Sequence, residues 1–145
     1  KWQKEWKKFN LYALKRNLKR LHQQKVIEFI KQNGQEVIKL THEGRTRYLK
    51  LQLKELSQKG GKWDGKWRIV IYDISKFKRN QQSSFRNFLK SMNFLLLQRS
   101  VYITPYPCEE HITYMREYFE IGEDVILIEA HKIENEQFYK DYFGL

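Results

Sequence analysis

Hydrophobic residues recur at helical spacing near the start of the chain. Asn10 is a residue type that caps helix N-termini, and the pattern after it predicts a helix that runs to about Gln24. Lysine and arginine fall mostly off the apolar face, so we expect an apolar stripe packed inward and a basic surface turned outward. The stripe consists of four residues separated by three and four positions: Leu11, Leu14, Leu18 and Leu21.

The pattern then changes to short β-rich runs. KVIEFIKQ and QEVIKL flank Asn33 and Gly34, and an Asn-Gly pair accepts positive φ angles in a tight turn, which predicts a β-hairpin. Thr41 then offers a polar cap for a leucine-rich helix, THEGRTRYLKLQLKEL. A basic helix, a hairpin and a returning helix form the back half of a winged helix-turn-helix, in which a recognition helix enters the major groove of DNA.

The second half of the chain alternates strands and amphipathic helices in the order β-α-β-β-α-β, the ferredoxin-like split βαβ arrangement. One face of such a sheet is covered by two helices, and the other needs a cover, often a second copy. The aromatic residues near the C-terminus, Phe138, Tyr139, Tyr142 and Phe143, must also dock somewhere. The expected elements are strands over Trp67–Ile74, Phe94–Gln98, Ser100–Thr104 and Asp124–His131, and helices over Gln81–Met92 and Glu109–Ile121.

These patterns predict an α+β protein: a partial winged helix followed by a ferredoxin-like βαββαβ domain. Residues 1–57 are expected to be a basic winged-helix-like DNA-binding region, 58–66 a hinge, and 67–145 a dimerisation domain. The winged fold is partial because only Lys1–Phe9 precede the recognition helix, where Trp2, Trp6 and Phe9 have helical spacing. We therefore expect a module reduced or truncated at this end.

Charge separates the two halves of the 145-residue chain, whose net charge is +11. Residues 1–66 hold 18 Lys/Arg and 6 Asp/Glu, a net charge of +12, and the remainder holds 10 and 11, a net charge of −1. This asymmetry favours a basic module for a polyanion joined to a near-neutral module. The alternative is a solvated lysine-rich surface.

The composition also narrows the class of protein. The chain lacks an apolar run of membrane-spanning length and its N-terminus lacks a signal-peptide core, so we expect a cytoplasmic protein with no membrane partner. Cys108 is the only cysteine, which rules out an intramolecular disulfide and a cysteine metal cluster. The four histidines lie on different predicted elements without metal-ligand spacing: His22, His42, His111 and His131.

The expected partner of the basic half is double-stranded DNA. Cations of the recognition helix and the wing would neutralise phosphates, and the exposed helix face would reach base edges. The alternative is that these residues merely solvate a surface helix. The predicted DNA-binding residues are Asn10, Lys15, Arg16, Asn17, Lys19 and Arg20 in the first helix, Lys31, Gln32 and Asn33 at the wing tip, and Arg47.

Two segments of the second half resemble a known family. KWDGKWRIVIYDIS, followed by a basic loop and later by QRSVYITPYP, resembles the central domain of the PaaX family of bacterial transcriptional repressors. That domain in turn resembles the CRISPR-associated Cas-two endonuclease family. The resemblance implies a DNA-associated homodimer, either a transcriptional regulator or a CRISPR-adaptation subunit that holds duplex DNA beside an integrase subunit. PaaX repressors have a further C-terminal domain, whereas this chain ends at Leu145, so acyl-CoA sensing is not implied.

Asp73 is the one candidate for catalysis or metal binding, because it follows the buried run Ile69–Tyr72 directly. The Cas-two resemblance implies that it faces its symmetry mate and that the pair holds magnesium at the dimer axis, as a metal-dependent endonuclease would require. No second acidic residue adjoins it, and Lys76, Lys78 and Arg79 could neutralise it instead. The alternative is a strand-end carboxylate that caps the following loop or helix. We therefore assign no catalytic residue and expect a binding protein rather than an enzyme.

Overall fold

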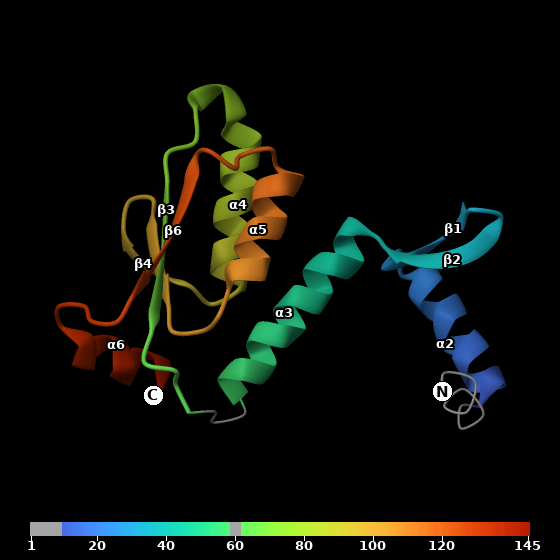
Figure 1. Ribbon diagram of the computed structural model, residues 1–145, viewed down its shortest axis with the longest axis horizontal. Coiled ribbons are helices and arrows are strands. Elements are labelled where there is room, and N and C mark those ends of the chain that lie inside the picture. The colour runs from blue at the N-terminus through green and yellow to red at the C-terminus, as the bar shows by residue number, and fades with distance from the viewer. Residues whose placement is uncertain (1–9, 59–61) are drawn as a thin grey trace. The chain divides into compact units, whose positions relative to one another are not determined.

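The computed structural model describes residues 10–58 and 62–145, and these divide into two compact units (Figure 1). The first unit ends at Leu49 and the second begins at Lys50, so the boundary falls inside helix α3 (His42–Gln58). The predicted hinge at 58–66 includes residues outside the described range and stays a prediction, as does the segment with Trp2 and Trp6.

The first unit contains the predicted helix and hairpin. Helix α2 (Leu11–Gln23) precedes strands β1 (Ile27–Gln32) and β2 (Gln35–Leu40), which pair antiparallel. Asn33 and Gly34 make the two-residue turn with φ angles of 51° and 76°, both positive as the Asn-Gly prediction requires. The hairpin prediction is therefore confirmed.

One part of the α2 prediction is wrong. Leu14, Leu18 and Leu21 are half-buried, but Leu11 is 62% exposed, and α2 has no fully buried residue. Leu11 is exposed because it is the first residue of the helix, at the end away from the unit's buried apolar side chains. Two of the buried apolar side chains of this unit, Val26 and Ile27, lie at the other end of α2, where the chain enters β1.

Close contact between the hairpin and α3 depends on Gly44. A Cβ atom on this residue would lie 1.9 Å from the carbonyl oxygen of Val26, so no larger residue fits there without displacing the backbone. Thr41 supports the same junction. Its hydroxyl donates to the carbonyl oxygen of Lys25 at 2.6 Å and accepts from the Gly44 amide at 3.1 Å, which caps α3 as the sequence predicts.

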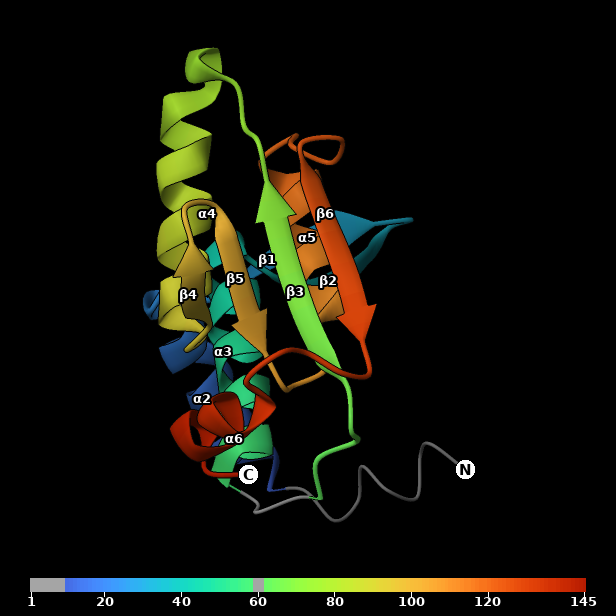
Figure 2. The ribbon, with the colours of Figure 1, turned by 90° about the vertical axis from the view of Figure 1, so that its left-hand side faces the viewer.

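The second unit has the predicted β-α-β-β-α-β order and is ferredoxin-like. Its four strands pair antiparallel in the order β4-β5-β3-β6 (Figure 2). Several elements are shorter than expected. For example, β3 ends at Tyr72 and not at Ile74, although Ile74 is still buried. The elements are β3 (Trp67–Tyr72), the 3-10 turn η1 (Lys76–Lys78), α4 (Arg79–Ser91), β4 (Leu95–Gln98), β5 (Val101–Thr104), α5 (Glu109–Tyr118), β6 (Val125–Ala130) and α6 (Glu136–Phe143).

Helices α4 and α5 cover one face of this sheet (Figure 2). Tyr72 on that face meets Phe85 of α4 edge-on, with ring centroids 5.5 Å apart, and the buried Val70 shares the face because side chains alternate along a strand. The apolar faces of the two helices complete the core. The residues that α4 and α5 bury include Phe85, Phe88, Leu89, Ile112 and Met115.

The opposite face is covered at one end only. Trp67 points to this face and contacts Tyr139 and Phe143 of α6, with ring centroids 6.0 and 6.2 Å apart, so the aromatic C-terminal segment docks there as a helix. Farther along the same face, Ile128 of β6 stays 40% exposed and Ile126 stays 56% exposed. This part of the sheet face is therefore a partly exposed apolar surface.

None of the described helices is long and apolar enough to cross a membrane.

Candidate nucleic-acid interface

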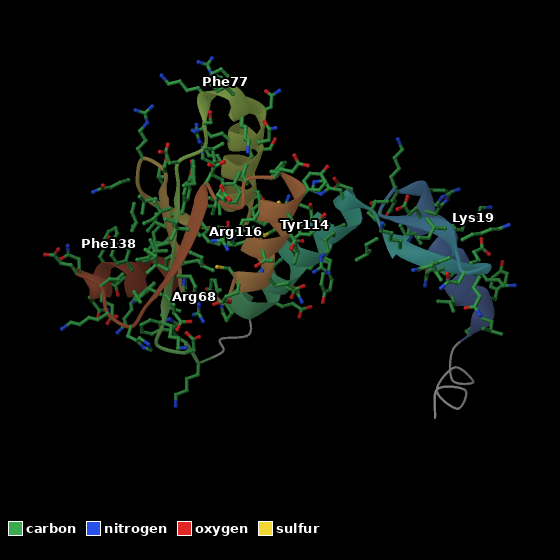
Figure 3. The ribbon with its side chains drawn as sticks, turned by 45° about the horizontal axis from the view of Figure 1, so that its top comes forward. Lys19, Arg68, Phe77, Tyr114, Arg116 and Phe138 are labelled. Atoms are coloured by element: carbon green, nitrogen blue, oxygen red, sulfur yellow. The ribbon has the colours of Figure 1, made fainter. Side chains whose placement is uncertain are left out.

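The basic residues of α2 point away from the unit's apolar contacts. Lys15, Arg16, Asn17, Lys19 and Arg20 are all exposed (Figure 3 labels Lys19). The helix contains no aspartate or glutamate, and the structure shows no ion pair for these cations within the described residues. Their charge is therefore available to an external anion.

Asn10 has a structural role in this interface. Its side-chain oxygen accepts hydrogen bonds from the amides of Tyr12 (3.1 Å) and Ala13 (3.2 Å), which caps α2. Of the predicted DNA-binding residues, Asn10 thus orients the helix through its oxygen and leaves only its side-chain NH₂ group for another partner.

The wing tip is exposed as predicted. Lys31, Gln32 and Asn33 all face solvent, and Lys31 lies opposite Glu36 in the β1–β2 register. The tip therefore presents polar side chains around a tight turn, with the charge of Lys31 facing a carboxylate across the ladder.

Arg47 is placed differently from the other predicted DNA-binding residues. Its guanidinium donates to the side-chain oxygen of Gln24 at 3.2 Å, at the C-terminal end of α2. Arg47 thus links α3 to α2 within the first unit. Its side chain remains exposed, so it contributes charge beside the helix as well as this contact.

Asp73 follows β3 directly, as the sequence predicts, and its carboxylate is exposed. Its backbone amide donates to the carbonyl oxygen of Asp124 at 2.9 Å, but the structure shows no described residue that hydrogen-bonds or pairs with its carboxylate. The capping interpretation is not seen, since Ser75 caps the next turn by accepting from the Phe77 amide at 3.3 Å. Lys78 does not neutralise Asp73 either, because its ammonium lies 3.7 Å from Asp124.

The described residues do not supply a metal site around Asp73. No group of three or more His, Cys, Asp or Glu side chains converges anywhere in the described part of the chain. The predicted magnesium site at the dimer axis requires the Asp73 carboxylate of a second copy as well, so it stays a prediction. The thiol of Cys108 is also poorly reactive, because burial raises its pKa to about 12.

The W-D-G-K-W-R segment forms a clasp at the start of β3, made of Trp63, Asp64, Trp67 and Arg68. The Arg68 guanidinium is buried and forms a two-pronged ion pair with Asp64, with nitrogen–oxygen distances of 2.8 and 2.6 Å. The rings of Trp63 and Trp67 pack 4.9 Å apart. These residues fix the entry of the chain into the sheet.

Residues 60–140 match the protein family described as the PaaX protein central Cas2-like domain. The chain belongs to this family. The match spans more than half of the 145 residues and confirms the resemblance carried by the clasp, the strand that ends at Asp73 and the Q-R-S-V-Y segment. No curated protein matches the chain.

Within the Cas2-like domain, sequence reasoning missed two residues. It treated Arg68 as part of a motif and not as a buried ion-pair partner, although Asp64 four residues earlier was a usable signal. It also gave Phe77 no role, whereas the structure leaves this side chain fully exposed between two lysines.

Proposed function

We propose that this PaaX-family protein is a DNA-binding transcriptional regulator that acts as a homodimer in the cytoplasm. In this proposal α2 enters the major groove and the wing tip meets the sugar-phosphate backbone. The observation that supports it most is the solvent-facing set of cations on a helix that carries no acidic residue. A Cas2-like domain joined to such a unit is consistent with a regulator.

The arrangement of the α2 side chains suggests how binding would be divided. Lys15 and Lys19 are one turn apart, as are Arg16 and Arg20, so the cations form two adjacent rows along the helix. Such rows suit phosphates on either side of a groove. Contacts with phosphates position the protein on the duplex but do not read its sequence. Asn17 borders the rows and has the amide chemistry that pairs with adenine, so it is our candidate for base contact.

The proposed dimer uses the uncovered face of the Cas2-like sheet. Ile69 and Ile71 of β3 lie opposite Ile128 and Ile126 of β6, and directly opposed residues point to the same face. A second copy seated on this apolar strip would bury it by two-fold symmetry, which is the commonest arrangement of homodimers. The identical patch on each copy makes the surface self-complementary.

DNA binding is tested by salt titration of the full chain on a duplex. We expect affinity to fall steeply with salt, because each neutralised phosphate releases counterions. Replacing Lys15, Arg16, Lys19 and Arg20 by alanine should weaken binding strongly and flatten the salt slope. The matched control replaces four exposed lysines elsewhere, Lys50, Lys62, Lys90 and Lys132. Equal losses in both variants would show that charge alone matters and that α2 is not the DNA-binding helix.

Dimerisation is tested by sedimentation of the full chain. Ile126→Lys should convert a dimer to a monomer, since it places a charge on the proposed interface. Leu96→Lys is the control, because Leu96 is also exposed but lies opposite Tyr102, on the helix-covered side of the sheet. A parent chain that sediments as a monomer at tens of micromolar would contradict the dimer.

The second candidate function is a CRISPR-adaptation subunit, which the Cas2-like domain favours. It would bind duplex DNA without sequence preference, as a scaffold or as a metal-dependent endonuclease beside an integrase subunit. Selection of bound sequences from random duplexes separates the regulator from the adaptation subunit, because enrichment of one DNA sequence supports the regulator. Asp73→Asn adds a second criterion. We expect unchanged duplex binding, whereas loss of a magnesium-dependent cleavage without loss of the dimer would support the nuclease.

A further inference from the structure

Phe77 is the most exposed large hydrophobic side chain of the Cas2-like domain, with a relative exposure of 101%. It lies in turn η1, which Figures 1 and 2 show projecting beyond the end of the sheet, and Figure 3 labels it at that tip. Several other aromatic rings of this domain pack against one another, whereas Phe77 makes no ring contact with the described residues. A phenylalanine held in water contributes no buried apolar area to the fold, so its ring is open to a ligand.

The turn that carries Phe77 is fastened on both sides. Ser75 accepts hydrogen bonds from the Phe77 amide (3.3 Å, at its hydroxyl) and from the Lys78 amide (2.9 Å, at its carbonyl). The Lys78 ammonium donates to the carbonyl oxygen of Glu120 at 2.7 Å, and the neighbouring Ile74 is buried. The backbone is thus held in a defined turn that directs Phe77 outward.

Unpaired positive charge lies close to Phe77 along the chain. Lys76 and Arg79 are exposed, and the structure shows no ion pair for either within the described residues. Arg99 lies at the same end of the sheet, because the carbonyl oxygen of the adjacent Ser100 accepts from the Tyr72 amide at 3.1 Å. Segment Asp73–Arg79 carries three cations against one carboxylate, and Lys78 alone is engaged with another acidic residue.

We propose that Phe77, Lys76 and Arg79 form a second nucleic-acid site, which binds an unpaired strand by stacking Phe77 on a base. The two cations would then meet the phosphates on either side of that base. An aromatic ring combined with backbone-tracking cations is how proteins hold single strands without sequence preference. Bases within an intact duplex have both faces covered by their neighbours, so an unpaired segment is the substrate that offers a face to the ring.

The surroundings of Phe77 argue against a protein or a membrane partner. Energetically dominant protein contacts sit within a cluster of apolar residues, whereas the residues next to Phe77 in η1 are both lysines. Membrane-surface binding needs a broad apolar helix face, and this turn provides one ring.

This site is independent of the proposed α2 interface, so the two can fail separately. The assay uses the full chain in which Lys15, Arg16, Lys19 and Arg20 are replaced by alanine, which removes the α2 contribution. The probe is a fluorescent oligothymidylate of about 15 nucleotides, the upper range for one small single-strand site. Phe77→Ala should weaken its binding by about 5- to 150-fold, the range that loss of one stacking partner of about 1–3 kcal/mol corresponds to.

Two matched variants separate stacking from general effects. Phe77→Trp should retain the affinity, because a larger ring stacks at least as well. Phe138→Ala removes another exposed phenylalanine, on α6 at the opposite end of β3 (Figure 3), and should change nothing. Lys76→Ala should weaken binding and reduce the salt dependence, whereas Lys90→Ala at the far end of α4 should not.

A direct contact can be mapped by photo-crosslinking. An oligonucleotide with 5-iodouracil should crosslink to the peptide that contains Phe77, because this base reacts with a stacked aromatic ring. Equal binding by the parent and Phe77→Ala, or crosslinks confined to other peptides, would overturn the proposal. A loss of duplex binding with unchanged single-strand binding would also overturn it, since that result indicates a wedge between paired bases.

Discussion

Arg68 and Asp64 form a two-pronged ion pair in which the arginine is buried and the aspartate is exposed. The same guanidinium also donates to the carbonyl oxygens of Lys66 (3.0 Å) and Pro105 (3.1 Å). One side chain therefore ties the segment before β3 to the segment after β5. The hydrogen bonds that Arg68 donates to Asp64 hold the pKa of Asp64 below its usual value and raise the pKa of Arg68.

Asp64→Asn should destabilise the Cas2-like domain by about 1–3 kcal/mol, because a buried cation loses its closer charged partner and keeps only Glu109 at 3.4 Å and its carbonyl contacts. The measurement is the free energy of unfolding in urea. Asp141→Asn is the control, since Asp141 is an exposed carboxylate whose one side-chain partner among the described residues is Gln137. Equal stability of the two variants would mean that the ion pair contributes nothing to folding.

The pH dependence of stability follows from the same carboxylates. Hydrogen bonds lower the pKa values of Asp64 (from Arg68), Glu129 (from Lys66) and Glu136 (from the Trp67 indole). A lowered carboxyl pKa stabilises the folded state above the ordinary value of about 4, and this contribution is lost as pH falls through the folded pKa. We therefore expect a stable plateau down to about pH 5 and a decline below about pH 4. The difference between the parent and Asp64→Asn should shrink over that decline; a constant difference down to the lowest pH would contradict the assignment.

The sequence predicted the elements whose signals are local. The Asn33–Gly34 turn and the Asn10 cap each depend on residues within a few positions, so pattern and structure agree there. The β-α-β-β-α-β order was also predictable, because each element carries its own periodicity and the topology follows from the order.

The sequence could not predict contacts between distant segments. The Trp67 indole donates to Glu136, 69 residues away, at 3.0 Å, and neither residue shows that α6 would cover this end of the sheet. The burial of Arg68 was not predicted either, because charged side chains are seldom buried. Its burial depends on the position of its carboxylate partner Asp64. Phe77 inverts the usual expectation, because an aromatic residue in a β-α loop normally joins the core.

Docking of α6 should contribute measurably to stability. Phe143 packs near Trp67 and near Tyr106, with ring centroids 6.2 and 6.3 Å apart, and is half-buried. Phe143→Ala should therefore cost about 2 kcal/mol of unfolding free energy, below the range for fully buried phenylalanines. Phe138→Ala on the same helix should cost less than about 0.5 kcal/mol because Phe138 is exposed. Similar losses for the two variants would show that α6 is not seated on Trp67.

Cys108 provides a probe of opening in the Cas2-like domain. Its side chain is fully buried and its pKa of about 12 leaves very little thiolate at neutral pH. Thiol reagents should therefore label the native protein very slowly, at a rate that rises with urea in step with unfolding. Rapid labelling of the native chain at neutral pH would contradict the burial of this residue.

Gly44→Ala should selectively destabilise the first unit. The added Cβ would collide with the Val26 carbonyl, and this backbone atom cannot move aside as a flexible side chain would. We expect a loss of about 1–3 kcal/mol, the usual cost of inserting a methyl group into a packed site. Gly122→Ala is the matched control, because its Cβ would have no atom within 4 Å.

Hydrogen exchange should show faster exchange of the β1–β2 amides in Gly44→Ala and native protection of β3 and β6. Since α2 joins the hairpin at Val26, this variant should also weaken duplex binding, while oligothymidylate binding through Phe77 should persist. Unchanged exchange in the hairpin would show that α3 and β1 do not approach each other as closely as this structure has them.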